Sequence, residues 1–248
     1  MRRGAIGACA CVLILLFSLY GCEKKKEYVV ETERYYVADG SQDFTITHTY
    51  DADGNRIESN ATGYPLFVQY TYNKKGYLIE ETGSEWGSEF VKSYEVDSKG
   101  RTVRKVFEYD GQIISTVSYE YSGERVTSEK WGDKDNTQNR RIEYHYDSSG
   151  RLVRVETISM STSTKYNYDS SGKLVGLDKA TSETMTYEEI ENDSNGNKVK
   201  STQFTEAGAP TGQVITYKYD EHGNMTEELG YQDGELLYGR EYTYIKIG

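Results

Sequence analysis

Apolar and polar side chains alternate along most of the chain after residue 44. In segments such as 46–50, 142–146 and 215–219, most of the alternate positions carry an aromatic or aliphatic residue. The positions between them are mostly Thr, Glu, Lys or Asn. A period of two places successive side chains on opposite faces of a β-strand. The pattern therefore predicts antiparallel strands with one aromatic face and one polar face.

A repeated motif divides the strands into units. Segment 144–153 reads YHYDSSGRLV, and segment 166–175 reads YNYDSSGKLV. Looser copies, including one that begins at Tyr72-Asn73 and a shortened one at 121–123, bring the number of units to eight. A motif that recurs at regular spacing along the chain indicates a repeat architecture.

The Asp and Gly of each motif have the chemistry of a hairpin turn. The Asp side chain accepts a hydrogen bond from the backbone two residues on, and the Gly three positions later adopts the left-handed conformation that closes the loop. The predicted turn-forming residues are Asp51 and Gly54, Asp97 and Gly100, Asp147 and Gly150, Asp169 and Gly172, Asp193 and Gly196, and Asp220 and Gly223.

Two strands for each of eight units predict an all-β fold. Asp39-Gly40, Asp110-Gly111 and Asp233-Gly234 are two-residue hairpin signals for the return turns. We expect an antiparallel up-and-down meander of about 16–18 strands, because strands joined by short turns lie side by side. An aromatic face cannot stay exposed on a flat sheet, so the sheet must curl into a shell or into an open or closed barrel.

The start of the chain has the pattern of an export signal. Met1-Arg2-Arg3 is followed by an apolar run over residues 5–20. Residues 19–22, LYGC, resemble the lipobox of bacterial lipoproteins, and that resemblance implies cleavage after Gly21 and lipidation of Cys22. The alternative is an ordinary signal peptide with an incidental cysteine.

These features predict three regions. Residues 1–21 are the lipoprotein signal peptide, residues 22–43 carry the lipidated Cys22, a polar tether and a leading strand, and residues 44–248 form the repeat domain. An aspartate after the cysteine would indicate retention at the inner membrane, and Glu23 is not that signal. We expect a lipid-anchored protein of the bacterial cell envelope, at the outer membrane or cell surface rather than the inner membrane.

Composition narrows the classes of partner. The formal net charge of −11 argues against nucleic acid, whose phosphates require clustered Lys and Arg. Two of the three cysteines lie inside the predicted signal peptide, so we expect no disulfide. Tyrosine is abundant, with 24 residues against 6 Phe and 2 Trp, so polar hydroxyls accompany the aromatic face.

The motif resembles a known family. The segment YDSSGRL at residues 146–152 is similar to the YD repeat of RHS proteins and of the related teneurin shells. The resemblance implies β-hairpins wound into a spiral sheet that can enclose a toxic polypeptide. This chain is shorter than such shells, and nothing in it after the last repeat resembles a toxin. Small YD-repeat-like lipoproteins of Bacteroidetes-type bacteria, described as porin-like, are a related possibility.

Catalytic and metal-binding motifs are missing from the sequence. His48, His145 and His222 fall in different repeats without a cysteine beside them, and one carboxylate per turn is a poor calcium cage. We therefore predict no enzyme activity, no cofactor and no metal. Trp86 and Trp131, at or near return turns, are the candidate ligand-binding residues, because exposed aromatic rings stack on sugars. The alternative is that both pack over the open ends of the core.

The function that we predict is a non-catalytic envelope scaffold that binds a glycan or a protein partner and contacts the membrane through its N-terminal lipid. The alternatives are an RHS-like shell or partner protein of a toxin system, and a porin-like outer-membrane β-barrel. Short strands and scattered charges speak against the barrel that crosses a membrane.

Overall fold

The structure, a computed structural model, describes residues 28–133, 138–158, 162–181 and 185–247. The predicted signal peptide, Cys22 and the tether lie outside these residues. The strands are β1 (Tyr28–Val37), β2 (Asp43–Tyr50), β3 (Arg56–Thr62), β4 (Leu66–Tyr72), β5 (Leu78–Glu85), β6 (Ser88–Val96), β7 (Thr102–Tyr109), β8 (Gln112–Ser122), β9 (Arg125–Gly132), β10 (Gln138–Tyr146), β11 (Leu152–Thr157), β12 (Thr162–Tyr168), β13 (Leu174–Ala180), β14 (Met185–Asn192), β15 (Lys198–Thr205), β16 (Pro210–Tyr219), β17 (Met225–Gln232) and β18 (Glu235–Lys246).

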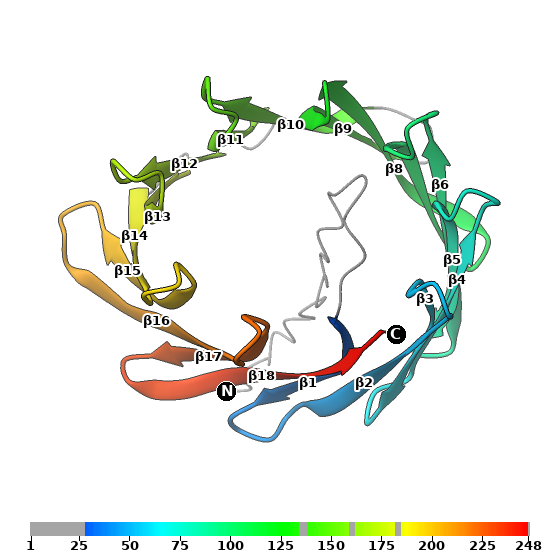
Figure 1. Cartoon of the computed structure of the whole chain (residues 1–248), viewed down its shortest axis with the longest axis horizontal. Coiled ribbons are helices and arrows are strands. Elements are labelled where there is room, and N and C mark those ends of the chain that lie inside the picture. The colour runs from blue at the N-terminus through cyan, green and yellow to red at the C-terminus, as the bar shows by residue number, and fades with distance from the viewer. Residues whose placement is uncertain (1–27, 134–137, 159–161, 182–184, 248) are drawn as a thin grey trace, which may run out of the picture.

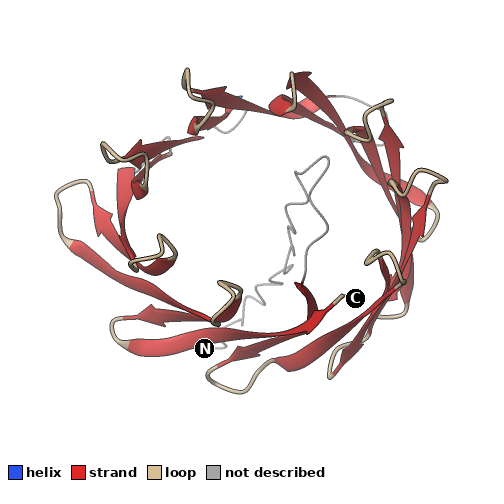
Figure 2. Cartoon of the chain, viewed as in Figure 1, coloured by secondary structure: helices blue, strands red, loops and turns tan. Residues whose placement is uncertain are grey.

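The 18 strands form one antiparallel sheet that closes on itself. Each strand pairs with the next in sequence, and β1 also pairs with β18 over the register Tyr28↔Lys246 to Val37↔Tyr238. Figure 1 shows the resulting ring, in which β1 and β18 lie side by side, and Figure 2 shows that strands make up the wall. The predicted all-β meander is confirmed, and the sheet is a closed barrel.

The motif turns form as predicted, all at one end of the barrel, which we call the YD end. In the turn between β10 and β11, Asp147 Oδ1 accepts hydrogen bonds from the backbone N–H of Ser149 and of Arg151, both at 2.9 Å. Gly150 closes the turn with φ of +85°. The same arrangement recurs in the other Asp turns and at Asn73.

The opposite end, which we call the return end, carries more varied turns. Asp110-Gly111 and Asp233-Gly234 are two-residue turns with positive φ at both positions, as expected. The prediction for Asp39-Gly40 is wrong, because residues 38–42 separate β1 from β2 and only Gly40 has positive φ. Trp86-Gly87 forms a two-residue turn, where the sequence predicted only that Trp86 lies at or near a return turn.

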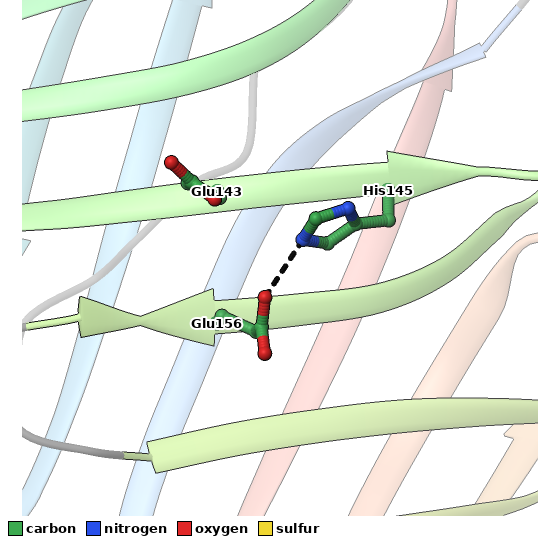
Figure 3. Close-up of side chains that lie close together, drawn as sticks. All are labelled: Glu143, His145 and Glu156. Carbon is green, nitrogen blue, oxygen red and sulfur yellow. Dashed lines mark hydrogen bonds and ion pairs between the residues drawn. The ribbon is translucent and has the colours of Figure 1, made fainter.

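The aromatic face points into the barrel. Figure 3 views β10 and β11 from outside, with the opposite wall behind them, and Glu143, His145 and Glu156 lie on the near, outer side. Tyr144 and Tyr146 alternate with Glu143 and His145 along β10, so they face inward. Residues paired directly across neighbouring strands face the same side of the sheet, so the registers identify the inward-facing residues of the other strands.

The inward side chains line a lumen and do not fill it. The described strands approach closely only the strands to which they are hydrogen-bonded, apart from marginal contacts, so opposite walls do not pack together. None of the large described side chains is completely buried. This agrees with the rule that barrels of about 16–18 strands are too wide for side chains to fill.

The outer face is polar. Charged residues that face outward from the strands include Arg34, Glu95, Arg104, Glu120, Lys130, Arg141, Glu143, Arg154, Glu156, Lys165, Glu191, Lys200, Lys218, Glu227 and Glu241. Many of them form ion pairs with one another across neighbouring strands. Among the described residues, no helix has the length and hydropathy needed to cross a bilayer.

Candidate functional site

Two layers of tyrosine rings line the lumen. The layer at the YD end consists of the motif tyrosines, and most of their hydroxyls donate to backbone carbonyls of a neighbouring strand. The second layer, two residues deeper, consists of Tyr70, Tyr94, Tyr119, Tyr144, Tyr166, Tyr217 and Tyr242. All seven stay half-buried, so their rings are open to solvent from the lumen.

Burial changes the acidity of this second layer. It raises the pKa of Tyr94, Tyr144 and Tyr217 far above the ordinary value, and it raises the pKa of Tyr242 to about 12. Nearby carboxylates add to the shift at Tyr94 and Tyr144, which donate hydrogen bonds to Glu81 and Glu129. The rings therefore present neutral hydroxyls at physiological pH, which can donate and accept hydrogen bonds.

Trp131 lies in β9 close to the return end and faces the lumen. Its indole N–H donates to Glu129 Oε2 at 3.0 Å, and Tyr144 donates to Glu129 Oε1 at 2.6 Å. The guanidinium of Arg140 lies over the indole ring, 4.0 Å from its centroid. Trp131, Glu129, Tyr144 and Arg140, which we call the Trp131 group, combine aromatic surface with a carboxylate and a cation.

Trp86 occupies the turn between β5 and β6 and is 69 % exposed. Its φ of +53° is a conformation that a bulky residue rarely adopts, and Asn or Gly would occupy it at lower cost. The indole N–H donates to the Tyr64 hydroxyl at 2.9 Å, and the two rings meet edge to face at 5.2 Å. A strained, exposed aromatic residue of this kind is a candidate contact for a ligand.

The two tryptophans do not form one site. Trp86 is at the rim of the return end and packs on Tyr64, whereas Trp131 is inside the wall beside Arg140. The sequence identified both positions from their place near return turns. It did not identify Glu129 or Arg140, because the signal for them is the cross-strand pairing of Arg140 with Trp131 in β9 and β10.

The Asp and Gly turn residues have structural roles. Asp51 uses Oδ1 to accept from the backbone N–H of Asp53 and Asn55, and uses Oδ2 to accept from the Asn55 amide at 2.9 Å. These bonds hold the pKa of Asp51 below its ordinary value. A carboxylate used in this way forms the turn, and its oxygens are not free to build a calcium cage.

One group on the outer face has ligand atoms suited to a metal. Glu143 and His145 on β10 and Glu156 on β11 offer one ligand atom each, all within 4.8 Å of one another (Figure 3). His145 Nε2 lies 2.9 Å from Glu156 Oε2. Arg141 and Arg154 already pair with the two carboxylates, at 2.9 and 3.2 Å, so a cation would have to displace two guanidinium groups.

Comparison with known proteins gives similarity of fold. No family model matches the sequence, and no curated protein matches it. A porin-like protein from Bacteroides uniformis is similar in structure, with a TM-score of 0.52 and 11% sequence identity, over 90% of this chain and 99% of that one. The TcdB2–TccC3 toxin structure matches 76% of this chain at 15% identity with a TM-score of 0.43, and this chain spans 12% of it.

Proposed function

We propose that this protein is a non-catalytic, lipid-anchored β-barrel of the bacterial cell envelope that binds a glycan in its lumen. The observation that carries the proposal is the Trp131 group, which places an indole ring, a buried carboxylate and a guanidinium on one patch of the inner wall. Sugar rings stack on aromatic faces and exchange hydrogen bonds with such polar groups.

The tyrosine layers extend this surface around the lumen. A tyrosine ring supplies a rigid contact area at low entropic cost, and its hydroxyl supplies a hydrogen bond. The half-buried rings at Tyr70, Tyr119 and Tyr166 face the same space as Trp131. A ligand with several sugar units would therefore meet rings on several strands.

The anchor sets the orientation that we propose. β1 begins at Tyr28, at the YD end, where the Tyr28 ring stacks on His222 of the last motif turn at 4.5 Å. If Cys22 carries the lipid, the chain between Cys22 and Tyr28 spans at most about 20 Å when fully extended. The YD end then faces the membrane, and the return end with Trp86 faces away from it.

Tryptophan fluorescence tests the proposal, because the chain has 2 Trp. Trp86→Phe leaves Trp131 as the reporter of the lumen, and Trp131→Phe leaves Trp86 as the reporter of the rim. We expect envelope glycans to change the emission of Trp86→Phe saturably and to bind Trp131→Ala more weakly. A saturable change only in Trp131→Phe would move the site to the rim, and no response to any glycan would reject the proposal.

A porin-like role is the second candidate, favoured by the closed barrel and by the similar fold of the Bacteroides uniformis protein. The ion pairs across the outer face argue against it, because a lipid-facing wall needs an apolar band. If a Cys22→Ser chain stays dissolved without detergent, the porin-like role is rejected. Co-purification of a polypeptide inside the barrel would instead support a shell for a toxin.

A further inference from the structure

We infer that the lumen ligand is an anionic glycan, and that Arg56, Lys105, Arg140 and Lys198 bind its negative groups. This inference rests on the proposed function and names the class of glycan. The basis is a difference among the charged groups of the inner wall: the carboxylates have partners within the protein, whereas these four cations form no ion pair among the described residues.

The described carboxylates that line the middle of the lumen are already engaged. Glu81 accepts from Tyr94 and pairs with Lys92 at 2.9 Å, and Glu129 accepts from Trp131 and Tyr144. Glu188 pairs with Lys179 and accepts from Ser201 at 3.0 Å.

Two further lumen carboxylates are also compensated. Glu228 lies 3.8 Å from Arg240 and accepts from Tyr238 at 3.3 Å. Burial raises the pKa of Glu33, and the positive charges of Arg240 and Arg56 oppose that shift. The negative charges of these lumen carboxylates are therefore compensated within the protein, and they oppose an anionic ligand less than free carboxylates would.

The four cations differ from these acids, because none of them forms an ion pair with a carboxylate in the described part of the chain. Each lies over an aromatic ring instead. Arg56 is 5.9 Å from the Tyr70 centroid, Lys105 is 5.3 Å from that of Tyr94, Arg140 is 4.0 Å from that of Trp131, and Lys198 is 4.7 Å from that of Tyr217.

Burial without a direct ion pair suits these cations to binding an anion. Arg56 also feels the charge of Glu33, with which it forms no ion pair among the described residues. Burial lowers the pKa of Lys105 and of Lys198, so an arriving anion would restore a favourable environment for each ammonium. Glu81 and Glu129 are the acidic groups that influence Lys105, and Glu188 and Glu228 influence Lys198, but other partners hold all four. The buried Nε of Arg140 also lacks a hydrogen-bond partner among the described groups.

The outer face shows that unpaired cations are not general in this protein. Arg104 pairs with Glu95, Lys200 pairs with Glu191 and Lys218 pairs with Glu227, each at 2.8 Å. The barrel thus pairs many cations where they face outward and leaves four unpaired where they face the lumen. In a protein with a net charge of −11, these four cations without an ion pair are the groups of the inner wall that attract anions.

The positions of the cations suit an extended ligand. Arg56 is on β3, Lys105 on β7, Arg140 on β10 and Lys198 on β15, so the cations are spread around the ring in Figure 1. Each cation has a tyrosine or tryptophan ring beside it. A sugar chain with carboxylate or sulfate groups offers both ring faces and charges, whereas an acidic peptide offers mainly charges.

Binding of charged and neutral polymers to the whole detergent-extracted protein tests the inference. The probes are an oligogalacturonate, a neutral maltooligosaccharide of equal length and poly-glutamate, measured by calorimetry. We expect the oligogalacturonate to bind, to bind more weakly as salt rises, and to lose affinity about tenfold or more in Lys105→Gln/Lys198→Gln. Lys200→Gln/Lys218→Gln, on the outer face, is the control and should bind like the unaltered protein.

The other outcomes separate the two proposals. Neutral oligosaccharide binding as tight as that of oligogalacturonate, and insensitive to Lys105 and Lys198, would overturn the anionic ligand and leave glycan binding in place. Poly-glutamate binding of equal strength and equal dependence on these lysines would overturn the glycan assignment. If neither sugar binds while the variants keep their thermal midpoints, both proposals fail.

Discussion

The hydroxyl of Tyr168, the last residue of β12, donates a 2.7 Å hydrogen bond to the backbone carbonyl of Leu152, the first residue of β11. The motif tyrosine therefore fastens its own repeat to the strand that follows the preceding motif turn. Equivalent bonds join Tyr50 to Val30, Tyr72 to Arg56, Tyr121 to Thr102, Tyr146 to Val126, Tyr219 to Lys198 and Tyr244 to Met225. This bond explains why a tyrosine precedes the Asp in most copies.

Removing this hydroxyl should destabilise the barrel. Tyr168→Phe keeps the ring in place and leaves the Leu152 carbonyl without its partner, so we expect a loss of about 0.5–1.5 kcal/mol in the free energy of unfolding. Urea denaturation followed by far-UV circular dichroism measures it. Tyr187→Phe on the outer face is the control, and equal midpoints for the two variants would contradict the role of the bond.

Two repeats lack the motif tyrosine and carry Val96 or Asn192 in its place, and the Val96 repeat offers the reverse experiment. Val96 ends β6 and faces the lumen where other repeats carry the motif tyrosine, and Leu78 begins the neighbouring β5. Val96→Tyr places a hydroxyl where it can donate to the Leu78 carbonyl. We expect a gain of about 0.5–1.5 kcal/mol, measured by the same denaturation. A lower urea midpoint than that of the unaltered protein would show that the site cannot accept the ring.

The sequence was sufficient to predict the local architecture. Asp147 and Gly150 specify their turn through bonds within five residues, and the alternation along β10 fixes which side chains share a face. The two-residue turn at Trp86-Gly87 escaped prediction because tryptophan has no turn preference, and the structure shows its positive φ and its indole N–H bonded to Tyr64. The sequence left closure between β1 and β18 as one of several options, because no local pattern encodes pairing between strands so far apart in the chain.

The candidate site was predictable only in part. Trp131 stands out by residue type, but its partners come from the register between β9 and β10. The sequence does not predict that Lys105 and Lys198 lack an ion pair, because many charged residues lie near them. Only the structure shows that the neighbouring carboxylates pair with other cations.

A side chain at a motif glycine should weaken its turn. Gly150 has φ of +85°, and a Cβ there would overlap the guanidinium of Arg125. We expect Gly150→Val to lower the thermal midpoint clearly, because a β-branched residue in the left-handed region costs at least about 1–2 kcal/mol. Gly150→Asn should cost less, since Asn tolerates that region. Equal midpoints for Val and Asn would show that backbone conformation does not limit this turn.

Acid should destabilise the barrel partly through His48. This residue is 6 % exposed, its Nδ1 lies 2.7 Å from Ser59 Oγ, and burial, aided by the charge of Arg56, lowers its pKa from 6.5 to about 3. Because the folded pKa is the lower one, the contribution of His48 to stability is complete above pH 6.5. This contribution is lost as the pH falls from 6.5 to 3, because in this range His48 binds a proton in the unfolded chain but not in the folded one. The free energy of unfolding then falls by up to about 1.4 kcal/mol per pH unit. His48→Gln should show a shallower decline of unfolding free energy over this window than His222→Gln, which keeps His48 and the same carboxylates. Parallel curves for the two variants would mean that His48 is protonated in the folded barrel.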